Sequence, residues 1–93
     1  MKAIWQGQVV ADSNDVREIG GYIYFPRSTV RMERLTASSK SDSDLACPHG
    51  VQFYDVSGDG QSSKRSAWSY EAPGEQMKQI DHWVGFWRDV EIK

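Results

Sequence analysis

The chain has 93 residues, with 11 Lys and Arg, 13 Asp and Glu and a formal net charge of −2. It therefore predicts one domain without the basic surface that binding to nucleic acid or to an anionic membrane requires. With Cys47 as the single cysteine the chain can form no internal disulfide, which favours a cytoplasmic protein whose aromatic side chains build the core.

Taken in chain order, the first residues lack the apolar stretch of a signal peptide, and no later run approaches the roughly 20 apolar residues that cross a membrane. Alternating apolar residues predict strands at residues 3–5 and 8–11. Gly20 and Gly21 can adopt the positive φ of a two-residue hairpin turn, so we expect residues 22–25 to form its return strand.

The remainder of the chain predicts one domain over residues 1–93, with short antiparallel strands and few helical residues. Residues 30–35 are expected to be extended, and residues 36–44, in which serine alternates with charge, to form a mobile loop. The elements expected after that loop are strands at 50–57 and 66–70 joined by a turn at 58–60, a short helix near 74–80, and strands at 83–87 and 90–92. The fold class is therefore mostly β.

Several short motifs follow one another along nearly the whole chain. They are Met1-Lys2-Ala3-Ile4-Trp5 with Gly7, Val9 and Val10; Tyr24-Phe25-Pro26; Cys47-Pro48; Tyr54-Asp55-Val56 with Gly60; Ala67-Trp68 with Tyr70 and Pro73; and Val84 with Phe86-Trp87. As an ordered set they resemble domain-of-unknown-function family 427, a group of small bacterial proteins sometimes labelled nucleotidyltransferase-like. The resemblance implies a β-tent-like fold, in which two sheets meet along one edge, and no agreed activity.

The chain departs from the family pattern at two places. Cys47-Pro48-His49-Gly50 stands where the family usually has Cys-Pro-aromatic-Lys-Gly, and Arg65-Ser66 stands where an acid usually precedes Ala-Trp. The chain also lacks a Gly-Ser motif followed by paired acids that could hold two magnesium ions, so the nucleotidyltransferase label adds no activity here. We assign no role to the family's lysine or acid in this chain.

Cys47 and His49 are the candidates for catalysis. They are two residues apart, so an extended backbone would place both side chains on one face, and an imidazole beside a thiol favours the reactive thiolate. One hypothesis is therefore a thiol-dependent enzyme with Cys47 as nucleophile or redox centre and His49 as its base, and the alternative is an inert buried thiol. Cys47, His49 and His82 are too few and too widely spaced for a structural zinc site, so we predict neither a metal nor a cofactor.

Aromatic residues supply the candidate binding site. Trp68 and Tyr70 share one face of the predicted strand 66–70, and Tyr54 could lie opposite them across the hairpin. Such rings are typical of small-molecule sites, but tryptophan and phenylalanine also dominate the cores of small sheets, so the alternative is that they are simply core. Arg31 and Glu33 alternate on the extended stretch before the serine loop, where they could contact an anionic ligand or form a surface ion pair.

Three functions remain open from the sequence, and no oligomeric state is assigned. The first is a binding module for a small molecule or a modified residue, with Tyr54, Trp68, Tyr70, Arg31 and Glu33 as ligand-binding residues and Cys47 and His49 at the edge of the pocket. The second is the thiol-dependent enzyme. The third is a protein-interaction module that uses an exposed tryptophan or the serine loop.

Overall fold

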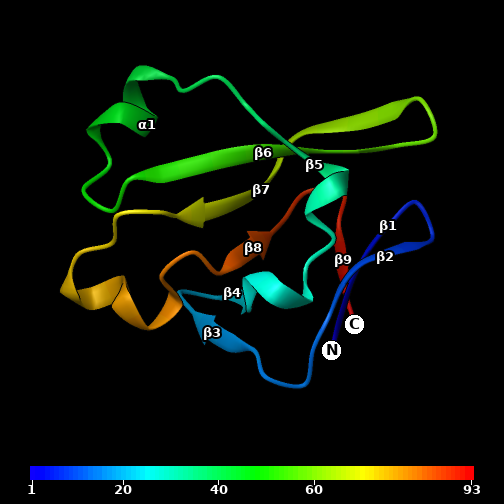
Figure 1. Ribbon diagram of the computed structural model, residues 1–93, viewed down its shortest axis with the longest axis horizontal. Coiled ribbons are helices and arrows are strands. Elements are labelled where there is room, and N and C mark those ends of the chain that lie inside the picture. Colours follow the sequence, from blue (N-terminus) through cyan, green and yellow to red (C-terminus); the bar gives the residue numbers. More distant parts are fainter.

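The computed structural model describes residues 1–93 and consists of two antiparallel sheets with short helical segments (Figure 1). The strands are β1 (Lys2–Trp5), β2 (Gln8–Asp12), β3 (Arg17–Ile19), β4 (Tyr22–Phe25), β5 (Leu35–Ala37), β6 (Val51–Gly58), β7 (Gln61–Tyr70), β8 (Val84–Phe86) and β9 (Glu91–Ile92). The helical segments are α1 (Asp42–Ala46) and the 3-10 turns η1 (Arg27–Thr29), η2 (Met32–Arg34) and η3 (Glu75–Ile80). The predicted mostly β fold, with two sheets and a short helix near 74–80, is confirmed.

The smaller sheet has the strand order β2-β1-β9, and the larger has the order β3-β4-β8-β7-β6-β5. Two-residue turns join the hairpins of the larger sheet. Gly20 and Gly21, with φ of 62° and 87°, join β3 to β4 as expected. Asp59 and Gly60, with φ of 52° and 77°, join β6 to β7. Positive φ at both turn residues matches the right-handed twist of the paired strands, which is why Gly and Asp stand there.

A bulge interrupts the long hairpin of β6 and β7. Val56 pairs with Ser63, but Tyr54 pairs with Ala67, so three residues of β7 lie opposite Asp55 alone. Arg65, at the centre of the bulge, has a φ of 55°, which is uncommon for a residue with a side chain. Its backbone N–H donates to Oδ1 of Asp55 at 3.0 Å. This bond stabilises the bulge, which turns the Arg65 side chain away from the regular pattern of the strand.

The segment before the long hairpin differs from the sequence prediction in two respects. Residues 30–35 are not extended throughout, because Met32–Arg34 form the turn η2. The loop expected at 36–44 is shorter, because β5 continues to Ala37 and α1 begins at Asp42. The helix starts at a capping box, in which Ser41 Oγ accepts from the Asp44 N–H at 3.2 Å and Asp44 Oδ2 accepts from the Ser41 N–H at 3.1 Å.

The larger sheet has buried apolar side chains on both faces. Ala67 and Trp68 are neighbours on β7, so their side chains point to opposite faces. Ala67 belongs to a core of 13 buried residues that also includes Trp5, Phe25 and Phe86. Trp68 belongs to a second core of four buried residues, Tyr24, Val51, Trp68 and Ile80. We call these the larger core and the smaller core.

Candidate functional site

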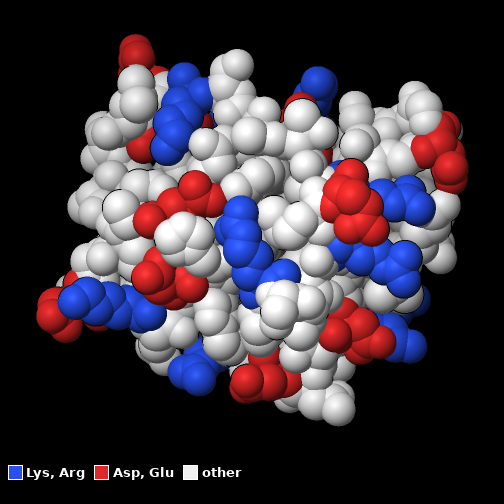
Figure 2. All heavy atoms as spheres, viewed as in Figure 1, with Lys and Arg blue, Asp and Glu red and all other residues white.

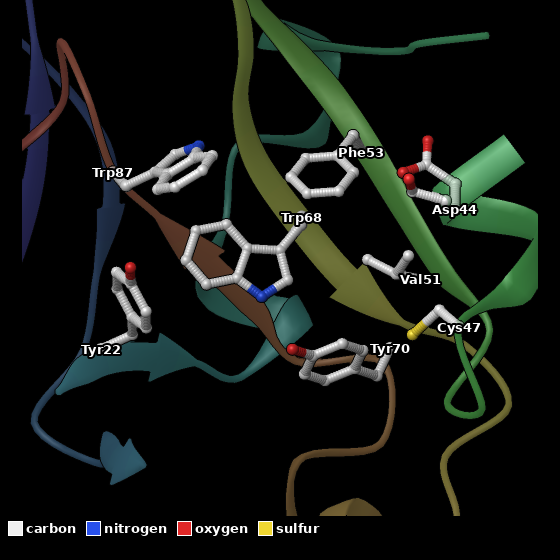
Figure 3. A pocket seen from close by; sticks show the side chains of 9 residues that line it. Tyr22, Asp44, Cys47, Val51, Phe53, Trp68, Tyr70 and Trp87 are labelled. Atoms are coloured by element: carbon white, nitrogen blue, oxygen red, sulfur yellow. The ribbon is translucent and has the colours of Figure 1, made fainter. Parts of the chain in front are cut away.

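A pocket of about 340 Å³ lies on the face of the sheet that carries the smaller core (Figure 3). Five aromatic side chains line it, from β4, β6, β7 and the residue after β8: Tyr22, Phe53, Trp68, Tyr70 and Trp87. The rest of the lining comes from Val51 and from α1 and the residue that ends it: Ser43, Asp44 and Cys47. The volume is at the lower end of the range for ligand pockets, roughly 300–1,000 Å³. We call this site the aromatic pocket.

Trp68 lies at the centre of the aromatic pocket, with 5% of its surface exposed (Figure 3). Its ring meets those of Tyr22 and Trp87 edge-on, with centroid distances of 5.1 and 5.6 Å. Its Nε1 donates to the hydroxyl of Tyr24 at 3.3 Å, and burial raises the pKa of that phenol, which therefore stays uncharged. The indole packs over Gly85 of β8, where an added Cβ would come within 2.8 Å of it. Trp68 is therefore both the floor of the pocket and part of the smaller core.

Arg65 joins three parts of the pocket wall. Its guanidinium donates twice to the buried carboxylate of Asp44, from Nη2 to Oδ1 at 2.8 Å and from Nη1 to Oδ2 at 3.0 Å. These bonds lower the pKa of Asp44 from 3.8 to about 2. The same guanidinium stacks on Phe53, with Cζ 4.0 Å from the ring centroid. The Arg65 carbonyl accepts from Trp87 Nε1 at 2.6 Å. The β7 bulge thus positions one residue against α1, β6 and the segment after β8.

Three of the residues singled out in the sequence come together in the structure. Trp68 and Tyr70 both line the pocket, because they alternate on β7 (Figure 3). Cys47 lies beside Tyr70 at the rim of the pocket (Figure 3), where it ends α1 and is half-buried. A role for any of them in binding or catalysis stays a prediction.

Tyr54 does not join this group. Its pairing with Ala67 places its ring on the other face of the sheet, in the larger core, and Phe53 takes the place expected for it. The Tyr54 hydroxyl donates to Oε2 of Glu71 at 2.6 Å and accepts from Nη2 of Arg27 at 2.9 Å. Burial and the bond to Glu71 raise the pKa of Tyr54. This network satisfies the phenol within the fold.

The backbone of Cys47 is extended, but it turns at residues 48–49, so Cys47 and His49 do not have the continuous extended geometry expected of the pair. They lie in a turn, because the Gly50 N–H donates to the Cys47 carbonyl at 3.3 Å. Nδ1 of His49 accepts from the Gly74 N–H at 3.0 Å, and the imidazole packs edge-on against Tyr70 with a centroid distance of 5.5 Å. The thiol lines the aromatic pocket, whereas the imidazole does not.

Arg31 and Glu33 are also outside the pocket. Both are exposed, beside and within the turn η2, and neither lines the cavity. The lining residues that sequence reasoning missed are Tyr22, Phe53, Trp87, Asp44, Ser43 and Val51. A local signal existed for one of them, because Ser41 followed three residues later by Asp44 is a capping-box spacing that predicts a helix start.

Charged side chains of both signs are interspersed over the face shown in Figure 2, and no single-sign patch gathers there. No three His, Cys, Asp or Glu side chains are grouped so that they could hold a metal ion. None of the helices has both the length and the apolar character needed to cross a membrane.

The chain was compared with family models and with curated proteins. No curated protein matches the chain. The family model described as a domain of unknown function (DUF427) matches residues 1–93. The match confirms the resemblance seen in the ordered motifs from Met1 to Trp87. The chain belongs to the DUF427 family.

Proposed function

We propose that this chain is a binding module for a small molecule or a modified residue, which it holds in the aromatic pocket. The observation that carries the proposal is the convergence of five aromatic rings from separate segments on one cavity of about 340 Å³. Ligand sites are typically concave and mostly apolar, with a few polar groups that orient the ligand. Here those groups are the hydroxyls of Tyr22, Tyr70 and Ser43 and the thiol of Cys47.

The partial exposure of the lining supports a binding role over a purely structural one. Tyr22 is 40% exposed although its ring contacts both Trp68 and Trp87. Phe53, Tyr70 and Trp87 are half-buried. Apolar surface left open to water loses the hydrophobic stabilisation that a filled core would have, and a ligand would recover it.

A ligand screen with two variants tests the proposal. Fragments that bind in the aromatic pocket should shift the indole N–H resonances of Trp68 and Trp87 in NMR spectra, and should slow alkylation of Cys47, the single thiol. Tyr22→Ala removes an exposed wall at small cost to folding and should abolish both effects. Trp83→Ala is the matched control, because Trp83 is a half-buried aromatic outside the lining.

The proposal is wrong if no fragment shifts the pocket resonances. It is equally wrong if hits bind the Tyr22→Ala variant as well as they bind the wild type. Folding of both variants is checked by circular dichroism before the screen, so that loss of binding is not confused with loss of structure.

The position of Cys47 in the lining favours the thiol-dependent enzyme as the second candidate. In that case the thiol would react with a ligand held against the aromatic rings, and the His49 imidazole would act as its base. Alkylation by iodoacetamide should then stay fast near pH 6 in the wild type and slow in His49→Ala. An unchanged rate profile in His49→Ala would remove this candidate and leave the binding module.

A further inference from the structure

The aromatic pocket has one acidic side chain in its lining, and that charge is already neutralised. Asp44 Oδ1 accepts from Arg65 Nη2 at 2.8 Å. Its Oδ2 accepts from Arg65 Nη1 at 3.0 Å and from the Ser41 N–H at 3.1 Å. Both oxygens are thus committed to groups of the protein itself. To bind this carboxylate, a cationic ligand would have to compete with the two hydrogen bonds that the Arg65 guanidinium donates to it.

Two guanidinium groups cover lining rings without lining the pocket themselves. Cζ of Arg65 lies 4.0 Å from the centroid of Phe53, and Cζ of Arg88 lies 4.7 Å from the centroid of Trp87. A cation is attracted by the negative face of an aromatic ring, and each of these two rings already has a guanidinium cation stacked on it. Two guanidinium groups thus lie on lining rings, and the one carboxylate of the lining is paired with the first of them.

The arrangement of the rings suits a flat ligand. The Tyr22 ring is at 87° to that of Trp68 and at 83° to that of Trp87. In such a corner, a flat ring can stack on one wall and point its edge at the other, which are the two favoured aromatic geometries. The hydroxyls of Tyr70 and Ser43 can hydrogen-bond a ring heteroatom without a charge on the ligand.

We propose that the aromatic pocket selects an uncharged aromatic heterocycle and discriminates against alkylammonium cations, the ligands that aromatic cages commonly bind. This inference rests on the proposed function and specifies its ligand class. The guanidinium groups on two of its rings and the paired state of Asp44 disfavour a cation, and the perpendicular walls favour a planar ring.

Quinoline and N-methylquinolinium are suitable probes, because they share a flat bicyclic shape and differ mainly in a positive charge. Their dissociation constants would be measured near neutral pH from shifts of the Trp68 and Trp87 indole resonances. We expect quinoline to bind about tenfold more tightly than N-methylquinolinium. A guanidinium group on the far side of a stacked ring repels a cation by about this much at an intermediate dielectric constant.

A cation that binds as tightly as quinoline, or more tightly, would overturn the inference while leaving the binding module intact. If other fragments bind in the aromatic pocket but neither quinoline nor N-methylquinolinium does, the planar-ring class is wrong and the binding module stands. A screen with no pocket hits at all would instead overturn the proposed function.

Arg88→Gln tests the cause of the discrimination. Arg88 is exposed and forms no ion pair, so its replacement should leave the fold intact and reduce the preference for quinoline about threefold. Arg88→Lys keeps the charge and should keep the preference. Arg17→Gln is the matched control, because Arg17 stacks on Trp83, outside the pocket, at 5.0 Å. An equal loss in Arg17→Gln would show an effect of overall charge and refute the local one.

Discussion

Replacement of Asp44 by Asn tests whether the ion pair with Arg65 holds α1 against the aromatic pocket. The bonds from Arg65, together with those from Ser41, lower the pKa of Asp44 from 3.8 to about 2, and each pKa unit corresponds to about 1.4 kcal/mol. Asp44 is 4% exposed, but the Arg65 side chain is 30% exposed, so solvent weakens the interaction. We therefore take about 2 kcal/mol as the stabilisation lost in Asp44→Asn at neutral pH.

The pH dependence follows from the direction of this shift. Because the folded state lowers the pKa, the stabilisation is complete above the unfolded value near 3.8 and is lost as pH falls through the folded value of about 2. Urea denaturation followed by tryptophan fluorescence should show wild type about 2 kcal/mol more stable than Asp44→Asn at neutral pH. The difference should shrink toward zero near pH 2.

Asp42→Asn is the control, because Asp42 is exposed on the same helix. It should change the free energy of unfolding by less than about 0.5 kcal/mol. Equal stability of Asp44→Asn and wild type at neutral pH would refute the reasoning. So would a difference that persists unchanged in acid, since it could not then come from ionisation of Asp44.

Two further changes test how Trp68 is held. Trp68→Ala should cost about 3–5 kcal/mol and lower the urea midpoint severely, because the indole is 5% exposed and is packed on several sides. A small loss would show that the indole is only a wall. Gly85→Ala should cost about 1–3 kcal/mol in thermal denaturation, because the new Cβ would lie 2.8 Å from that indole, whereas Gly58→Ala meets mainly the flexible end of Arg34. Equal effects at the two glycines would contradict the packing described.

The long hairpin shows how far the sequence could lead. The existence of a turn around Asp59-Gly60 and the shared face of Trp68 and Tyr70 were both predictable from residue types. The face of Tyr54 was not, because it depends on loop length. A three-residue turn would place Tyr54 on the face of Trp68, but the observed turn has two residues and pairs Gly58 with Gln61. A one-residue change in register moves every side chain to the other face of the sheet.

The rest of the pocket depends on contacts between distant segments. Tyr22 and Trp87 reach Trp68 from β4 and from the residue after β8, and no local pattern in either segment indicates that meeting. The bulge at Arg65 is equally hidden, because its neighbours fit a regular strand. Only the start of α1 had a local signal, in the spacing of Ser41 and Asp44.

The unequal division of buried side chains across the larger sheet has a dynamic consequence. Four buried residues form the smaller core, against 13 on the other face, so the elements that complete it should open at a lower free energy than the whole molecule. Amide hydrogens of α1 and η3 should therefore exchange with solvent through local unfolding, ahead of those in the centre of β7. A ligand in the aromatic pocket binds only the closed form, so it should slow this exchange in proportion to its saturation. Ligand occupancy of the aromatic pocket and protection of the α1 and η3 amides from exchange would then report the same closed state.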